Sequence, residues 1–415
     1  MIHPLLLRLV AGLMALGLVT PSTAGGQTPD GMPRYTVDLL VHPDAHVIEM
    51  AVGIELPGGA VRRFLLGPSY TLVTIRADGA TVDTSVSTAP IPNLRLITVR
   101  PDGTGPVRVS LGYQGPLFEL VSPSLNVVGP DLVELSVDSF WLPYQADLGA
   151  PFEVDATVRG LPANAVAVAN LPVSVDGDRL RIRSGPAGTA DLALIAAPGL
   201  RETRAGRFRM LSADPSAPLA AYYRRHGAAA IGFLEQLLGP MPGGEATITV
   251  AKRASGRGYA RPGYVVVTDV PGTSPGPGQA KFVTHEFAHL WFSRASLTGE
   301  DYWLVEGPAE YLGLRYVRDS LGPDAVAPML ASIRATAAKA PPVLGHGRAP
   351  DAALYAKCPA LLFALEERIG RSRMDSLLAR LAALPRHTTA LFLEQLAQVA
   401  GAGVASDFEA DLRRE

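Results

Sequence analysis

The stretch "AKFVTHEFAHLWFSRA", residues 280–295, contains two of the chain's eight histidines, His285 and His289, with Glu286 directly after the first. Helical patterns dominate the chain from Lys281 onward. On a helix, residues four apart lie on one face, so both imidazoles can present a nitrogen to one ion. Glu286 points off that axis and can reach a water on the metal. The H-E-x-x-H pattern therefore favours a catalytic zinc site with a general base beside it.

A catalytic zinc site needs a third protein ligand and leaves a fourth position for water. Downstream stands "EDYWLVEGPAEYLGLRYV", residues 300–317. Sixteen residues separate His289 from Glu306, enough to leave one helix, turn and enter an antiparallel neighbour. A lone Glu306 reads as a surface residue, but its aromatic and apolar neighbours make an unpaired carboxylate costly. Gly307 allows close backbone approach, and Glu310, one turn on, can orient a ligand histidine from behind.

Composition narrows the class of protein. The chain has 415 residues, enough for two or three domains. Hydrophobic residues make up 47% and charged residues 18%, a globular balance. A net charge of -2 without a basic stripe argues against nucleic acid as a partner. Cys358 is the sole cysteine, so an exported form has no internal disulfide, and any metal must be held by His, Asp and Glu.

The N-terminus, "MIHPLLLRLVAGLMALGLVTPSTAGG", is typical of an export signal. An apolar run over 9–19 ends before Pro21, and Ser22-Thr23-Ala24 offers small residues for cleavage. A retained membrane anchor is the alternative, but the apolar run is short for a span. We therefore predict a signal peptide over 1–24 and a protein exported to a periplasm or beyond the cell, with no stable membrane span after signal removal.

Two domains are expected after the signal, giving an α+β multidomain class. Residues 33–210 alternate apolar and polar side chains, which predicts an all-β sandwich or saddle. Within it, Asp78-Gly79 and Asp176-Gly177 are expected to form tight hairpins. Residues 211–415 are expected to form a mainly helical domain, with a first helix over 219–238, strands over 246–252 and 263–270, and an irregular Gly/Pro-rich loop over 271–280.

The pair "VTHEFAHLWF" (283–292) and "WLVEGPAEYL" (303–312) resembles the gluzincin metallopeptidases of the alanyl-aminopeptidase and leukotriene-hydrolase group. Residues 35–58, 107–117, 233–252 and 388–412 extend the likeness over nearly the whole mature chain. The resemblance implies a saddle-shaped β domain, a thermolysin-like catalytic domain and no helical-repeat domain.

The resemblance also implies a chemistry: a peptide or protein substrate hydrolysed at one Zn²⁺ ion. His285, His289 and Glu306 hold that ion, Glu286 is the general base, and Glu310 orients a histidine.

The family uses a tyrosine, usually within Y-x-K-G, to donate a hydrogen bond to the oxyanion. Here "YAKC" places Tyr355 at that position, with Lys357 after it and Cys358 where glycine is usual. A phenol suits the role because it is neutral and can donate. Tyr355 as a core aromatic is the alternative, and His346 is a competing donor because thermolysin uses a histidine here. We prefer Tyr355 and interpret Cys358 as a packing residue.

Two departures from the family pattern stand out. The chain between His289 and Glu306 is two residues shorter than usual, which a loop can absorb. The family's aminopeptidases carry G-x-M-E-N, whose glutamate holds the substrate's amino group, and Ala260 falls at that glutamate. Arg257 and Arg261 would repel an amino terminus if they face the cleft; otherwise they point to solvent. An endopeptidase, an aminopeptidase with another anchor, and an inactive secreted binding module on the same fold all remain possible.

Overall fold

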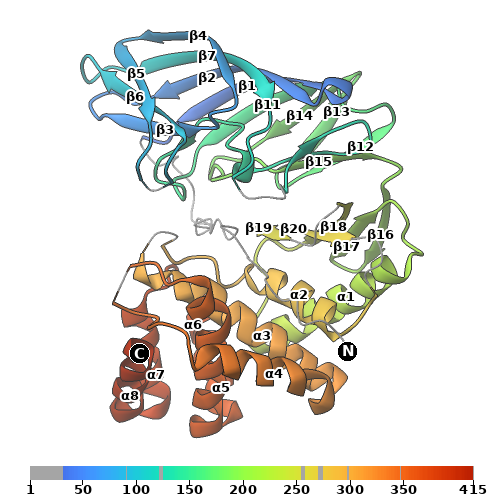
Figure 1. Cartoon of the computed structure of the whole chain (residues 1–415), viewed down its shortest axis with the longest axis vertical. Coiled ribbons are helices and arrows are strands. Elements are labelled where there is room, and N and C mark those ends of the chain that lie inside the picture. The colour runs from blue at the N-terminus through green and yellow to red at the C-terminus, as the bar shows by residue number, and fades with distance from the viewer. Residues whose placement is uncertain are drawn as a thin grey trace. The chain divides into compact units, whose positions relative to one another are not determined.

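The computed structural model describes residues 31–89, 91–120, 125–253, 258–269, 274–296, 299–345 and 347–414. These residues form two compact units that divide between Leu200 and Arg201 (Figure 1). The predicted signal over 1–24 lies outside the described residues, as do Arg257 and His346. No helix within the described ranges is long and apolar enough to cross a membrane. An all-β unit followed by a mainly helical one confirms the expected fold class.

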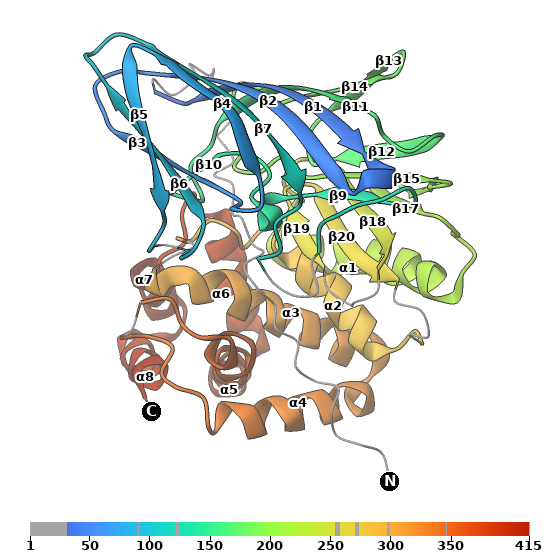
Figure 2. The ribbon, with the colours of Figure 1, turned by 45° about the horizontal axis from the view of Figure 1, so that its top comes forward.

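The β unit is built from strands whose alternate residues are buried, as the sequence pattern predicts. One sheet has the order β13-β14-β11-β1-β2-β7-β4. In it β1 pairs antiparallel with β2 and parallel with β11, and Figure 2 shows β1, β2 and β7 side by side. Its strands are β1 (Arg34–His42), β2 (Val47–Leu56), β4 (Thr71–Asp78), β7 (Val107–Pro116), β11 (Glu153–Arg159), β13 (Val173–Asp176) and β14 (Arg179–Arg183).

Shorter sheets complete this unit. One has the order β10-β3-β6-β5 and another the order β12-β15-β9-β8. Their strands are β3 (Arg62–Leu66), β5 (Ala80–Val86), β6 (Arg95–Pro101), β8 (Val127–Val128), β9 (Val133–Leu135), β10 (Tyr144–Gln145), β12 (Ala165–Ala169) and β15 (Leu194–Pro198). Two 3-10 turns, η1 (Pro43–Ala45) and η2 (Val137–Ser139), join strands within the described part of the unit.

The two predicted hairpins have different outcomes. The one at Asp176-Gly177 is confirmed: β13 pairs with β14, and Gly177 has a φ of 62°. The one at Asp78-Gly79 is wrong, although Gly79 does turn the chain at a φ of 75°. There β4 pairs with β7 and β5 pairs with β6, so the turn leads from one sheet into another. A turn signal fixes the local backbone angles but not the strand partner.

The second unit contains a sheet of order β16-β17-β18-β20-β19. β17, β18 and β20 run parallel, and the antiparallel strands β16 and β19 form its edges. The strands are β16 (Arg201–Ala205), β17 (Phe208–Ser212), β18 (Ala246–Lys252), β19 (Tyr259–Arg261) and β20 (Tyr264–Asp269). The domain boundary expected at 210/211 thus falls inside β17, which pairs with β18 from Phe208 to Ser212.

The helices of this unit lie between β17 and β18 or after β20 in the chain. They are α1 (Pro218–Leu238), α2 (Pro277–Ala288), α3 (Trp303–Leu321), α4 (Pro323–Ala337), α5 (Cys358–Ile369), α6 (Arg371–Ala383), α7 (Thr389–Ala400) and α8 (Ala402–Arg413), with a 3-10 turn η3 (Glu300–Tyr302) and a short π-helix η4 (Ala353–Lys357). The prediction of an irregular loop over 271–280 is wrong from Pro277 onward, because α2 begins there. Proline at the first helical position has its φ already set and has no amide hydrogen to satisfy there.

The core of this unit brings α2 against both the sheet and α3. Val267 of β20 and Ala260 of β19 share one apolar cluster with Val283 and Phe287 of α2. On the other side, α3 approaches α2 so closely that a Cβ on Gly313 would lie 2.7 Å from the backbone oxygen of Lys281. A glycine is needed at this crossing, and the crossing sets the distance between the two helices.

Candidate active site

The H-E-x-x-H residues lie at the C-terminal end of α2. The helix ends at Ala288, and His289 occupies the C-cap with helical angles, φ -61° and ψ -18°. The i, i+4 relation is therefore kept, and the Nε2 atoms of His285 and His289 lie 3.2 Å apart. Both side chains are buried, at 7% and 6% exposure.

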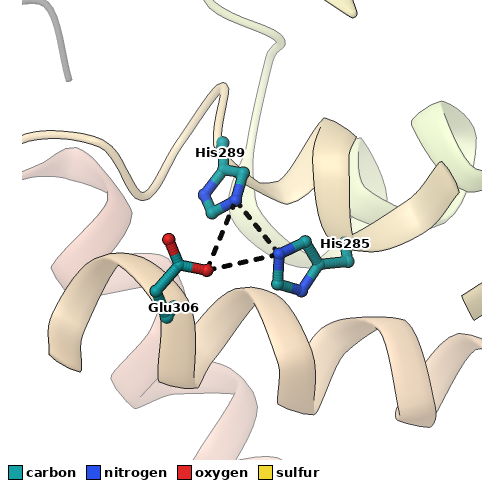
Figure 3. A group of neighbouring side chains, drawn as sticks. All are labelled: His285, His289 and Glu306. Atoms are coloured by element: carbon teal, nitrogen blue, oxygen red, sulfur yellow. Dashed lines mark hydrogen bonds and ion pairs between the residues drawn. The ribbon is translucent and has the colours of Figure 1, made fainter. Parts of the chain in front are cut away.

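Glu306 lies in the first turn of α3 and faces the two imidazoles (Figure 3). Its Oε2 is 3.4 Å from His285 Nε2 and 3.8 Å from His289 Nε2. Further along α3, Glu310 contacts His285 and Lys281. Glu306 thus contacts the later residues of α2 and Glu310 the earlier ones, so the two helices run antiparallel. The sequence analysis expected this arrangement.

The donor set fits a zinc ion. His285, His289 and Glu306 form a buried group of possible metal ligands among the described residues, with their ligand atoms within 4.8 Å of one another. Zn²⁺ prefers imidazole nitrogen and carboxylate oxygen at about 2.0–2.2 Å in a tetrahedron, which places ligand atoms roughly 3.3 Å apart. The separations of 3.2, 3.4 and 3.8 Å agree with that spacing.

Glu310 and Lys281 lie behind His285. Glu310 Oε2 is 3.0 Å from His285 Nδ1, on the ring side away from the cluster. Lys281 forms an ion pair with the other oxygen, Oε1. A carboxylate beside Nδ1 favours the tautomer that carries the proton there and leaves the Nε2 lone pair for an ion. Lys281 was not anticipated from the sequence, although its position four residues before His285 on the same helix face was a usable signal.

Tyr302 is a second residue that sequence reasoning missed. Its hydroxyl donates to Glu306 Oε1 at 2.7 Å, and its side chain is 2% exposed. The guanidinium of Arg348 lies over its ring, 4.0 Å from the centroid. The four-residue spacing between Tyr302 and Glu306 is present in the sequence. It does not distinguish a partner of Glu306 from a tyrosine that only packs in the core.

Burial and close charges shift the pKa values of the cluster. Burial lowers the pKa of His289 to about 4. Burial also opposes the charged form of His285, but the carboxylates of Glu306 and Glu310 raise its pKa to about 10. Against burial, His289 and His285 lower the pKa of Glu306 to about 2. Lys281 and His285 lower the pKa of Glu310 to about 2. A divalent cation at this site would take the place of the proton on His285, because an imidazole must be neutral to bind a metal.

Glu286 is a buried carboxylate beside the ligand group. It is 6% exposed, and burial raises its pKa to about 7. Glu306 adds to the rise, whereas His285, Arg261 and Lys281 oppose it. A carboxylate with a pKa near neutrality can both accept and return a proton.

Tyr355 projects from the π-helix η4 toward the cluster. Its ring centroid is 6.2 Å from that of His285. Burial raises the pKa of its hydroxyl well above the usual value, and a hydrogen bond to Glu306 contributes. The phenol thus stays protonated and can donate. The competing candidate, His346, lies outside the described residues.

Ala260 lies on the edge strand β19, on the face that packs against α2. It carries no carboxylate that could pair with an ammonium group. Arg261, on the opposite face, is 2% exposed and does not point to solvent. Its guanidinium donates to the Ala260 carbonyl at 2.8 Å and lies 4.9 Å from the Tyr259 ring centroid.

Comparisons with known proteins define the fold. No protein-family model matches the sequence, and no curated protein matches it significantly. Solved structures do match. Leukotriene A4 hydrolase from Saccharomyces cerevisiae aligns with a TM-score of 0.68 and 14% identity over 95% of this chain and 71% of that one. The M1 zinc metallopeptidase from Deinococcus radiodurans aligns with a TM-score of 0.63 and 18% identity over 96% and 97%. The chain therefore has the fold of the M1 zinc metallopeptidases, and the expected likeness in fold is confirmed.

Proposed function

We propose that the chain is a zinc-dependent hydrolase of peptide bonds. The buried group of His285, His289 and Glu306, with the carboxylate of Glu286 beside it, carries the proposal. The fold supports it, since the similar structures are of zinc metallopeptidases. One of them, a variant of the Deinococcus radiodurans protein, was solved bound to a Tyr-Ser-Ala substrate.

Each residue has a role in this account. His285, His289 and Glu306 hold the zinc ion, and Glu310 keeps His285 in the binding tautomer. When bound, zinc polarises a carbonyl oxygen and makes a coordinated water acidic. Glu286 accepts a proton from the attacking water and returns it to the leaving amine. Tyr355 donates a hydrogen bond to the oxyanion that forms on the substrate.

Glu286→Gln tests the proposal. The amide keeps the shape but cannot accept a proton, so peptide cleavage should fall about 10²- to 10⁴-fold. Zinc content should not change, because Glu286 is not a proposed ligand. Glu235→Gln, at a glutamate of α1, is the control and should keep full activity. A zinc-loaded wild type that cleaves no faster than Glu286→Gln would favour the inactive binding module.

We also propose that substrates need no free amino terminus. The position available for an amino-anchoring carboxylate on β19 is Ala260, and the neighbouring charge is the cation of Arg261. Cleavage of one peptide in N-acetylated and free-amine forms tests this. Comparable rates are expected. Strong preference for the free amine would indicate an aminopeptidase with another anchor.

Export is a further part of the proposal. It depends on the signal pattern over 1–24. Sequencing the N-terminus of the mature protein should show cleavage after Ala24 and recovery outside the cytoplasm. An intact N-terminus on a cytoplasmic protein would contradict it.

A further inference from the structure

The two oxygens of Glu306 have different partners. Oε2 faces His285 and His289, whereas Oε1 accepts the hydrogen bond from Tyr302. In Figure 3 one oxygen of Glu306 points toward the histidines and the other points away from them. We infer that Tyr302 is a positioning residue that holds Glu306 as a one-oxygen ligand of the zinc site, an inference that rests on the proposed function.

The orientation of the carboxylate matters because nothing intrinsic to glutamate fixes it. Its terminal torsion is broad, so a free carboxylate can offer one oxygen or both. A tetrahedral catalytic zinc takes three protein ligand atoms and keeps a fourth position open. A second oxygen from Glu306 would compete for that open position. A hydrogen bond of 2.7 Å to Oε1 engages that oxygen and leaves Oε2 to face the histidines.

Tyr302 is itself held in place. It ends η3, whose preceding residue, Asp301, accepts hydrogen bonds from the backbone and hydroxyl of Thr389 at 2.7 and 2.8 Å. Arg348 covers the phenol ring at 4.0 Å. A cation over an aromatic face is attracted to it. The hydroxyl is thus fixed through its backbone and through its ring.

The chain offers a matched control in another buried tyrosine–glutamate pair. Tyr311 is buried in α3 and donates to a carboxylate oxygen of Glu366 at 2.7 Å, the same distance as in the Tyr302 pair. Glu366 is not in the ligand group. Tyr311→Phe therefore removes an equivalent buried hydrogen bond without touching the metal site.

The experiment is a zinc titration against a competing chelator, with folding checked by thermal unfolding. Tyr302→Phe should weaken zinc affinity about 10- to 100-fold, the usual cost of losing a group that orients a ligand. Tyr311→Phe should bind zinc as the wild type does. Cobalt substitution gives a second signal: the visible absorption of Tyr302→Phe should change in intensity if Glu306 adds its second oxygen, and that of Tyr311→Phe should not.

The outcomes separate the two proposals. A wild type that binds no zinc overturns the proposed function and this inference with it. A wild type that binds zinc, together with Tyr302→Phe of unchanged affinity and cobalt spectrum, overturns the inference alone. If Tyr302→Phe does not fold, Arg348→Gln replaces it, since it loosens the phenol without emptying the core. Weaker zinc binding by Arg348→Gln then supports the inference, and unchanged binding overturns it.

Discussion

Two tyrosine hydroxyls interact with Glu306, and we propose a separate role for each. Tyr302 lies behind the carboxylate and donates to Oε1, away from the histidines. Tyr355 comes from η4, where its ring centroid is 6.2 Å from that of His285, and it is the proposed donor to the oxyanion. The first should therefore affect how tightly the ion is held, and the second how fast the bond is broken.

Tyr355→Phe tests that division. Removing an oxyanion donor should lower kcat about 10²- to 10³-fold, because the hydrogen bond strengthens in the transition state. KM should change little, and zinc affinity should fall less than in Tyr302→Phe. Steady-state kinetics and chelator competition measure both, with Tyr302→Phe as the comparison. A Tyr355→Phe enzyme with wild-type kcat would assign the oxyanion to another donor.

Arg261 provides a prediction of pH dependence. Its positive charge lowers the pKa of Glu286, which burial otherwise raises. Glu286 acts as a base only when ionised, so activity is present above its pKa and lost as pH falls through it. Arg261→Met should raise that pKa and move the acid limb of kcat/KM to higher pH. The exposed Arg108→Met is the control. An acid limb that stays in place or moves lower would exclude the proposed coupling.

Candidate site residues could be predicted from the sequence where they lie close together in the chain or where zinc chemistry requires a further ligand. Four residues, His285, Glu286, His289 and Glu306, follow from a short motif and from the need for a third ligand. Tyr302 does not follow, because its role depends on which oxygen of Glu306 it meets. That choice is made by side-chain torsions and by the approach of Arg348 from a distant loop.

Among the elements, the α2–α3 crossing sets the spacing of the proposed metal ligands. Gly313→Ala would place a methyl group 2.7 Å from the Lys281 carbonyl and 3.4 Å from His285 Cβ. The helices must separate, at a cost of about 1–3 kcal/mol of unfolding free energy. Zinc affinity should fall as well, because α2 carries both histidines and α3 carries Glu306.

Gly232→Ala is the matched control. Gly232 is exposed on α1, and a Cβ there would meet nothing within 4 Å. In a helix interior, alanine should stabilise by roughly 0.5–1 kcal/mol relative to glycine. Denaturant unfolding and zinc titration of the two variants give opposite signs of stability change if the account is right. A Gly313→Ala protein as stable as Gly232→Ala would contradict the close crossing.

Helices and strands were predictable from the sequence where the hydrophobic periodicity and the Gly/Pro stop signals indicate the same boundaries. Helix α1 ends at Leu238 before Gly239, and strand β18 covers 246–252, as predicted. Two errors have physical causes. Proline at 277 begins a helix rather than prolonging a loop, and the turn at Gly79 joins strands that pair with other partners. Pairing depends on contacts far along the chain, which local patterns do not contain.

At the scale of the whole molecule, the unit boundary is the informative feature. The change in hydrophobic pattern predicted a domain boundary at 210/211, where the linker-like segment begins. The structure divides the chain at Leu200, because β16 and β17 extend the sheet of the second unit. A strand of either unit has the same alternating sequence pattern, so the sequence alone could not assign β16 and β17 to the second unit.

A fragment comparison tests the boundary. A fragment starting at Leu211 lacks β16 and the residues Phe208 and Met210, which are buried beside β18. Each loses about 1.5–3 kcal/mol of burial, and β18 is left with an unpaired edge. This fragment should be less soluble and melt lower than one starting at Arg201. Equal solubility and melting temperature would contradict the assignment of β16 and β17.

Anomalous diffraction at the zinc edge, from crystals of the purified protein, tests the proposed zinc site. The account predicts one zinc peak in contact with Nε2 of His285, Nε2 of His289 and a single oxygen of Glu306. No peak there, or a zinc ion bound by other residues with Glu306 turned away, would contradict it.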